Sequence, residues 1–244
     1  MNILPEIDKI SNELKKIFKD LHQHPELGFE EVRTSEIVKK RLQDFGVDEI
    51  HTNIGKTGVV AVINGKQKGA NQIGLRADMD ALPIHEDSKL SFRSLNDGVM
   101  HACGHDGHMA ILLGVAQALS KNTKLKKGTV RFIFQPAEEG LGGARYMRKD
   151  GCLKGVDEIY GLHLWNYQRY GEVGVKTGPV MASADLFDIE VMGKGGHGAT
   201  PQGTVDPIVV ASNLITQLQT IVSRNTNPLE STVISIGKIN QING

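Results

Sequence analysis

The chain has 244 residues, and its 28 basic and 28 acidic side chains give a formal net charge of zero at pH 7. Hydrophobic residues make up 39% and charged residues 23%, fractions that exclude disordered, collagen-like and low-complexity classes. A neutral chain lacks the basic surface that nucleic acid or an anionic membrane would attract, which favours a small-molecule partner. The opening MNILPEIDKISNELKK contains acids and no continuous apolar stretch, so we expect no signal peptide and a cytoplasmic protein.

The N-terminal part predicts two helices followed by a strand. Apolar residues spaced three and four apart from Ile7 to Leu21 predict an amphipathic helix that ends before Pro25. A second helix is expected over residues 37–45, with a glycine after it as the C-terminal stop. The segment GVVAVING, residues 58–65, predicts a strand closed by an Asn-Gly turn.

Strands and helices then alternate along the chain. Strands are expected at residues 72–80, 129–135 and 158–165, and helices at residues 108–122 and 142–151. Because parallel strands need crossover connections, this alternation predicts an α/β fold with a mixed, largely parallel sheet and helices on both faces. We expect this first domain to comprise residues 1–180.

The pattern changes after about residue 180. Residues 184–196 and 231–240 alternate like half-exposed strands, and residues 206–224 between them predict a long amphipathic helix. This order predicts a smaller α+β unit over residues 181–244. The Asn-Gly pair at residues 243–244 is a hairpin signal, so the chain is expected to be a fragment of a longer one.

The densest group of candidate metal ligands is HACGHDGH, residues 101–108. Thiolate, imidazole and carboxylate groups all bind divalent transition metals. Cys103 and His105 are two residues apart, so on an extended stretch their side chains point to the same side. The alternative is a pair of exposed histidines beside a buried thiol.

Three further groups follow or lie within predicted strands. Glu138 and Glu139 are adjacent carboxylates, which tolerate each other best beside a cation; a solvated turn is the alternative. Asp78 and Asp80 share a face at the end of a strand, where turn capping is the alternative. His163 lies inside an apolar segment, where a structural core histidine is the alternative.

These groups all fall at or just past the ends of strands of one predicted sheet. Together they offer more acids than one ion needs, which predicts either two ions or one ion and a general base. A last motif, GKGGHGATP at residues 193–201, presents His197 on a glycine-rich turn. A plain loop is the alternative there.

In this order the motifs resemble those of the M20 metallopeptidase family. HQHPELGFEE, GLRADMDALPI, HACGHDGHMA, QPAEEGLGGA, GLHLW and GKGGHGATP are similar to its amidohydrolase branch. That branch includes bacterial N-acyl-amino-acid amidohydrolases, hippurate hydrolases and plant auxin-conjugate hydrolases. The resemblance covers the whole chain. It implies a zinc-peptidase-like α/β catalytic domain and an inserted, ferredoxin-like lid domain through which subunits form a homodimer.

The resemblance also implies roles for individual residues. The implied metal ligands are Cys103, His105, Glu139 and His163. Glu138 matches the general base, Asp80 the acid that supports the metal site, and His197 the lid histidine that reaches a substrate. Asp78 stands where related branches place a histidine ligand, so it is not counted as a ligand. The family's last metal-binding histidine is absent, so residues 1–244 alone are expected to bind metal weakly and hydrolyse poorly.

The activity implied by the resemblance is hydrolysis of N-acyl amino acids to a carboxylic acid and a free amino acid by a metal-activated water. One or two divalent ions are expected: the thiolate favours Zn²⁺, the resemblance favours Mn²⁺, and Co²⁺ is a third candidate. The alternatives are an inactive remnant that binds metal or self-associates, and a carboxypeptidase or dipeptidase of the same family. A structural zinc site is a further alternative, but it would be closed and tetrahedral and leave Glu138 without a role.

Overall fold

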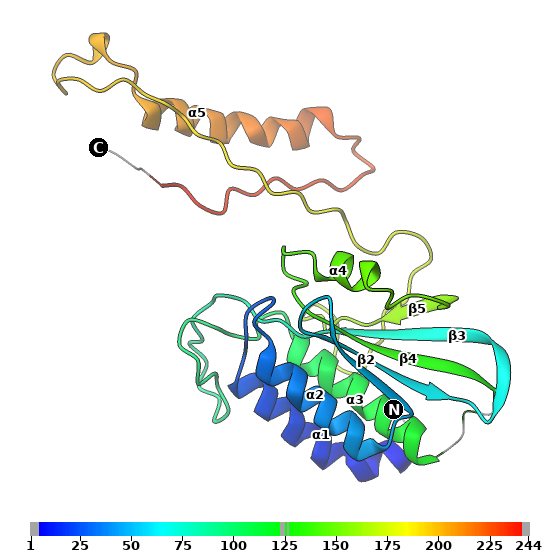
Figure 1. Cartoon of the computed structure of the whole chain (residues 1–244). Helices are drawn as coiled ribbons and strands as arrows, with labels where there is room; N and C mark the ends of the chain where they lie inside the picture. The colour runs from blue at the N-terminus through cyan, green and yellow to red at the C-terminus, as the bar shows by residue number, and fades with distance from the viewer. Residues whose placement is uncertain (1–4, 123–124, 126, 241–244) are drawn as a thin grey trace. The chain divides into compact units, whose positions relative to one another are not determined.

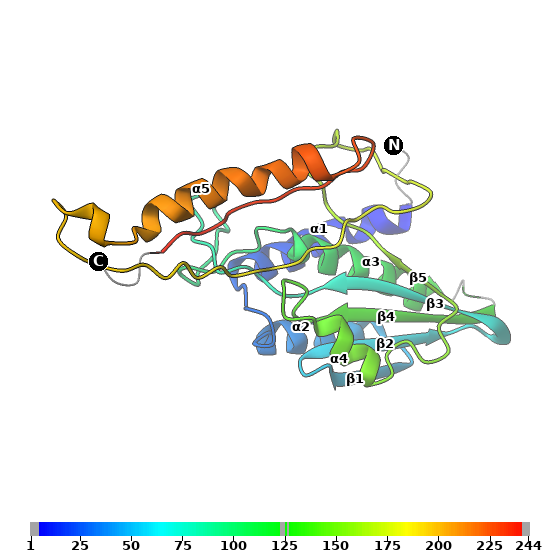
Figure 2. The ribbon, with the colours of Figure 1, turned by 90° about the horizontal axis from the view of Figure 1, so that it is seen from above.

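The computed structural model describes residues 5–122, 125 and 127–240, which fall into two compact units, Met1–Gly174 and Val175–Gly244. The first unit is built on a five-stranded sheet with the strand order β1-β2-β4-β3-β5, which can be followed in Figure 2. The strands are β1 (Glu49–Ile54), β2 (Gly58–Asn64), β3 (Gln67–Asp78), β4 (Lys127–Gln135) and β5 (Glu158–Gly161).

Helices cover both faces of this sheet, as the alternating pattern predicts. Three of them lie together on one face and α4 lies on the other (Figure 1). Their bounds are α1 (Pro5–Gln23), α2 (Val32–Phe45), α3 (His105–Asn122) and α4 (Gly143–Lys149). The predicted stop of α2 is confirmed, because Gly46 adopts a left-handed φ of 74° and its N–H bonds back to the last turn.

The sheet is mixed, which confirms the predicted fold class. β3 pairs in parallel with β4 and with β5, whereas β1–β2 and β2–β4 are antiparallel, so the parallel share is smaller than predicted. The pattern of apolar residues does not predict β1, an edge strand of sequence EIHTNI in which exposed and half-buried residues alternate. A polar edge strand has no buried face to produce a strong apolar pattern, and such edges resist unwanted pairing.

The core lies between the sheet and the three helices on one face. Val130, Phe132 and Phe134 of β4 point into it together, which confirms the predicted alternation. They pack in one cluster with Ile17 of α1 and Leu113 of α3. Since β4 is paired on both sides, this cluster fixes the centre of the sheet on which the polar residues described below are mounted.

The prediction that His163 lies within a strand is wrong. β5 ends at Gly161, where its last pairing is with Arg76 of β3. Beyond that point the chain leaves the sheet, and the Leu164 N–H donates to the His108 ring instead of to a neighbouring strand. The side-chain hydrogen bond therefore replaces a ladder bond, and His163 is exposed.

The second unit contains the predicted helix but not the two predicted strands. α5 (Pro207–Thr220) is capped by Asp206, whose carboxylate accepts the N–H groups of Ile208 and Val209. The helix continues as one π-helical turn, Ile221–Asn225. Among its described residues only an isolated bridge, Lys194 to Val205, pairs in strand fashion. Alternating apolar and polar residues at 184–196 and 231–240 would give a strand one apolar face, but they do not provide a neighbouring strand to pair with. The structure describes both segments and has no strand in either, so both strand predictions are wrong.

The hairpin predicted at residues 241–244 lies outside the described residues. Of the helices that the structure describes, none is both long enough and apolar enough to cross a membrane.

Candidate metal centre

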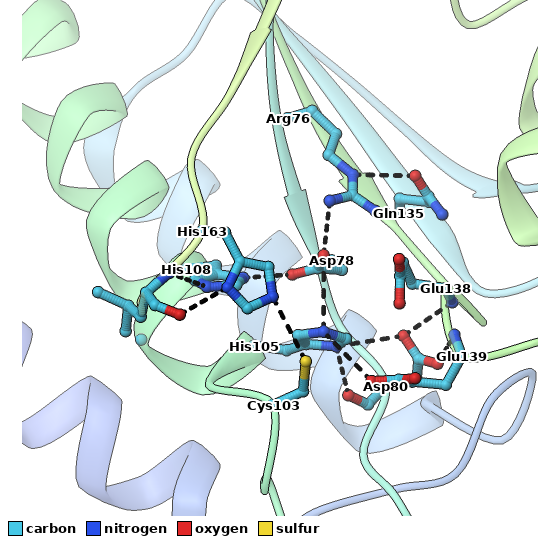
Figure 3. Close-up of polar contacts among 12 residues, drawn as sticks. Arg76, Asp78, Asp80, Cys103, His105, His108, Gln135, Glu138, Glu139 and His163 are labelled. Atoms are coloured by element: carbon cyan, nitrogen blue, oxygen red, sulfur yellow. Dashed lines mark hydrogen bonds and ion pairs between the residues drawn. The ribbon is translucent and has the colours of Figure 1, made fainter. Parts of the chain in front are cut away.

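Four segments of the first unit meet at the carboxyl ends of its parallel strands (Figure 3). They are the end of β3, the loop after β4, the residues that begin α3 and the chain beyond β5. In open α/β sheets this edge is where ligands bind, because the connections diverge there. Residues far apart in sequence can therefore place their side chains around one point.

A thiol and two imidazoles form one part of the site. The Cys103 Sγ lies 3.4 Å from the His163 Nε2. Donor atoms of Cys103, His105 and His163 all lie within 4.8 Å of one another, a separation that one metal ion can bridge. The two residues predicted from HACGHDGH and the one predicted from GLHLW are thus brought together.

The paired glutamates form the other part. Donor atoms of His105, Glu138 and Glu139 also lie within 4.8 Å of one another, so His105 is common to both groups. Glu138 is exposed and Glu139 is half-buried, both in the loop that follows β4. Because the His105 Nδ1 is bonded to the Asp80 carbonyl, only its Nε2 is free to bind an ion, and the two donor groups lie side by side around that nitrogen.

Asp80 forms hydrogen bonds with both parts of the site, the His105 ring and the loop with the two glutamates. Its carboxylate accepts the backbone N–H of Glu138 and that of Glu139, each at 2.9 Å. Its backbone carbonyl accepts from the His105 Nδ1 at 2.8 Å. The Asp80 side chain is buried, and its hydrogen bonds tie the loop with the two glutamates to the start of α3.

The His105 ring supports the presence of a cation. Its Nδ1 is committed to Asp80, whereas its buried Nε2 has no hydrogen-bond partner and faces Glu139 Oε1 at 3.8 Å and Asp78 Oδ2 at 3.6 Å. A buried polar atom without a partner is costly, and a metal-binding histidine donates its other ring nitrogen in this way. The donor set therefore fits a divalent ion.

The acids and the thiol of the site shift one another's pKa. Burial, together with the neighbouring carboxylates of Glu139 and Glu138, raises the pKa of the Cys103 thiol to about 12. Burial and the Glu139 charge raise the pKa of Glu138 as well. These shifts disfavour the ionised forms of Cys103 and Glu138, whereas a bound cation would favour them.

A buried glutamate that sequence analysis did not single out anchors the acidic loop. Glu31 is fully buried, and its Oε1 accepts the N–H of Ala137 at 2.8 Å while its Oε2 accepts the Thr57 hydroxyl. Ala137 has a left-handed φ of 48°, which is uncommon for a residue with a Cβ. Gly28 lies against it, leaving only 3.1 Å between an added Cβ and the Ala137 Cβ. The HPELGFEE motif thus supports the loop that carries Glu138 and Glu139.

Three further polar residues, Arg76, His108 and Gln135, complete the network. The Asp78 carboxylate accepts from the His108 Nδ1 at 2.6 Å and from the Arg76 guanidinium at 2.5 Å, and Arg76 also donates to Gln135 at 2.9 Å. All three lie in motifs quoted above, but adjacency in sequence gives no sign of which side chains pair. The period of two between Arg76 and Asp78 on β3 was the available signal.

His197 belongs to the second unit. It lies in the turn between Lys194 and Val205, where its ring accepts the N–H of Ala199 at 3.1 Å and its carbonyl accepts that of Thr200 at 2.8 Å. Its side chain is exposed, as the glycine-rich turn predicts.

The Asp78 environment predicts an acid-sensitive contribution to stability. Burial alone would raise its pKa, but the hydrogen bond from His108 and the charge of Arg76 lower it to about 2, from an ordinary 3.8. A carboxyl group with a depressed folded-state pKa stabilises the fold above its unfolded pKa, and this stability is lost as the pH falls through 3.8 towards about 2.

We therefore expect the free energy of unfolding of the metal-free protein to fall more steeply in this acid range than that of the Asp78→Asn variant. Urea unfolding at a series of pH values measures both slopes. Parallel slopes for the two proteins would show that Asp78 carries no such linkage.

The fold and the donor set define an α/β protein with a candidate divalent-metal centre at its sheet edge. The chain belongs to peptidase family M20/M25/M40, whose sequence profile matches residues 74–237. This confirms the family resemblance of the motifs.

Individual relatives agree with this assignment. The N-acetyl-L-cysteine deacetylase of Bacillus subtilis is 48% identical over 234 residues, which cover 96% of this chain and 56% of that protein. The hippurate hydrolase of Campylobacter jejuni is 46% identical over 242 residues, 98% of this chain and 62% of that protein. The chain thus spans roughly three fifths of the length of these curated relatives.

A solved structure supports the fold and the kind of site. The Bacillus subtilis YXEP protein, a dinuclear metal binding peptidase from the M20 family, matches with a TM-score of 0.67 and 46% identity. The match covers 70% of this chain and 48% of that one.

Proposed function

We propose that this chain is part of a metal-dependent amidohydrolase that cleaves N-acyl amino acids into a carboxylic acid and a free amino acid. The observation that carries the proposal is the convergence of Cys103, His105, Glu138, Glu139 and His163, whose donor atoms form two groups that share His105. The similar deacetylase and hippurate hydrolase act on acylated amino acids, by their names, and support the choice of substrate.

In this proposal the ions are held by Cys103, His105, Glu139 and His163. A divalent ion bound there would lower the pKa of a coordinated water to about 7 and would polarise the scissile carbonyl. Zn²⁺ and Mn²⁺ are the proposed ions and Co²⁺ a further candidate, since a mixed thiolate, imidazole and carboxylate set suits several of them.

Glu138 is the proposed general base. It is the exposed member of the acid pair, so its carboxylate can reach a substrate and a water molecule beside the donor groups. It would take the proton of the attacking water and return it to the leaving amine. Asp80 fixes the backbone of Glu138 and so keeps the carboxylate in place.

The second unit is the proposed lid. We propose that residues 1–180 form the catalytic domain, that residues 181–244 belong to a domain through which two subunits pair, and that His197 contacts the substrate. A location in the cytoplasm completes the proposal.

The substrate class is tested with the full-length protein loaded with Mn²⁺ or Zn²⁺. An N-acetyl amino acid and a dipeptide of the same amino acid are compared by kcat/KM, with metal content measured on the same samples. We expect the acylated amino acid to be hydrolysed faster. A preference for the dipeptide would assign a peptidase, and no turnover by a fully loaded protein would contradict the enzymatic proposal.

Replacing Cys103 tests the ligand set. We expect Cys103→Ala to lower metal affinity by about 10-fold or more and activity with it, because a ligand is lost. Cys152→Ala is the matched control, since Cys152 is buried in a small cluster with Val60, Ile133 and Met147, away from the donor groups. Normal metal content in the Cys103 variant would remove Cys103 from the ligand set.

A further inference from the structure

Histidines 105, 108 and 163 lie close together in the metal centre, yet their ring nitrogens have different partners (Figure 3). In His105 and His163 one nitrogen is anchored to a backbone carbonyl, of Asp80 at 2.8 Å and of Leu164 at 2.6 Å. The other nitrogen faces the donor group, with His105 Nε2 unpartnered and His163 Nε2 beside the Cys103 Sγ. This is the arrangement of a metal-ligating histidine.

His108 differs because both of its nitrogens are used within the protein. Its Nε2 accepts the Leu164 N–H at 2.9 Å, and an acceptor nitrogen carries no proton. The proton must therefore be on Nδ1, which donates to the Asp78 Oδ1 at 2.6 Å. The His108 residue is 1% exposed, so the protein supplies the partners of both ring nitrogens.

We propose that His108 is a positioning residue that aligns His163, and that it is not a metal ligand although it lies within 4.8 Å of donor atoms of His105 and Asp78. The inference deepens the proposed function, because it assigns the support of one of its ligands.

The alignment runs through the backbone of Leu164. His108 fixes the Leu164 N–H, and the Leu164 carbonyl in turn accepts from the His163 Nδ1, which sets the plane of that ring. This support is needed because β5 ends at Gly161 and strand pairing no longer holds the chain. The His108 and His163 rings also pack edge to face, with centroids 4.7 Å apart.

On its other side His108 is tied to the sheet. Asp78 accepts from its Nδ1 and is itself held by Arg76, which donates to Gln135 at the end of β4. The loop with Glu138 and Glu139 begins directly after Gln135. A chain of hydrogen bonds, with the buried bond between His108 and Asp78 at its centre, thus connects the acidic side of the metal centre with its His163 side.

The first test needs no variant. The full chain is prepared with nitrogen-labelled histidine, and its ring nitrogens are observed by NMR without metal and with NMR-active cadmium, a soft ion that thiolates bind. We expect His108 to be protonated on Nδ1 in both states, and cadmium couplings to appear at His105 and His163 but not at His108. A cadmium coupling at His108, or a proton on its Nε2, would overturn the proposal.

The second test separates the two hydrogen bonds of the His108 ring, one with Asp78 and one with Leu164. In His108→Gln the amide oxygen can take the place of Nε2 and accept from Leu164, whereas in His108→Asn the amide NH₂ can take the place of Nδ1 and donate to Asp78. We expect metal affinity, measured by competition with a chelator, to fall about 10–100-fold in His108→Asn and by much less in His108→Gln. The thiolate absorption band of the Co²⁺-loaded protein should weaken in the Asn variant only.

Thermal unfolding of both metal-free variants shows whether a loss of affinity reflects a loss of fold. Equal losses in two folded variants, or wild-type affinity in His108→Asn, would contradict the positioning role. All these measurements concern metal binding, so failure to hydrolyse an N-acyl amino acid would refute the proposed function without deciding this inference.

Discussion

We expect Glu138→Gln to retain its metal and to lose kcat by about 100-fold or more, since general acid–base catalysis contributes roughly 10²–10⁴-fold. The amide has the size of the carboxylate but cannot accept the proton of the attacking water. The backbone N–H of residue 138 would still donate to Asp80, so the loop keeps its position. Steady-state kinetics and metal analysis on the same preparation measure the two effects.

The neighbouring glutamate provides the matched control. Glu139→Gln makes the same chemical change one residue away, in a side chain that faces the His105 Nε2 at 3.8 Å. Because Glu139 is a proposed ligand, we expect this variant to lose metal as well as activity. If Glu138→Gln loses its metal while Glu139→Gln retains it, the two assignments must be exchanged, and near-normal kcat in the former would mean that another group is the base.

Truncation of the central core residue has the largest expected effect on stability. Phe132 is fully buried on β4, which is paired with strands on both sides. We expect Phe132→Ala to lower the free energy of unfolding by about 3–5 kcal/mol, because it removes a large apolar side chain and leaves a cavity that the sheet cannot close. Urea unfolding followed by circular dichroism gives the difference.

Tyr170→Ala is the control for this change, because it removes an aromatic side chain from the same unit at a fully exposed position. Its expected effect is within about 0.5 kcal/mol. If both variants lose similar stability, the cluster around β4 does not dominate the core.

The parts of the fold that could be predicted from sequence are those with a strong apolar period. The stripe from Ile7 to Leu21 and the alternation of Val130, Phe132 and Phe134 each have one buried face, and the structure contains the corresponding α1 and β4. The polar edge strand β1 has no such face and was missed. In the second unit alternation was present without pairing, since a period of two specifies a face and not a partner.

The candidate site could be located from sequence because polar residues at strand ends must meet at one edge of a parallel sheet. The hydrogen bonds that support the site could not be predicted in this way. Nothing in the spacing of Glu31 and Ala137, or of His108 and Leu164, shows that their hydrogen bonds form, because these depend on how distant segments pack. His163 was predicted on a strand for the same reason, since the bond that draws its segment away from the sheet joins residues 56 apart in sequence.

The hydrogen bond between Glu31 and Ala137 joins residues 106 apart in the chain, and its consequence concerns the kinetics of folding. Closing so long a loop costs conformational entropy before any contact compensates for it, and structures rich in such contacts fold slowly. The hydrogen bond that supports the left-handed turn of the acidic loop can form only once the segment near Glu31 has packed beside Ala137. We therefore expect the two glutamates to reach their positions late in refolding, after the core has formed.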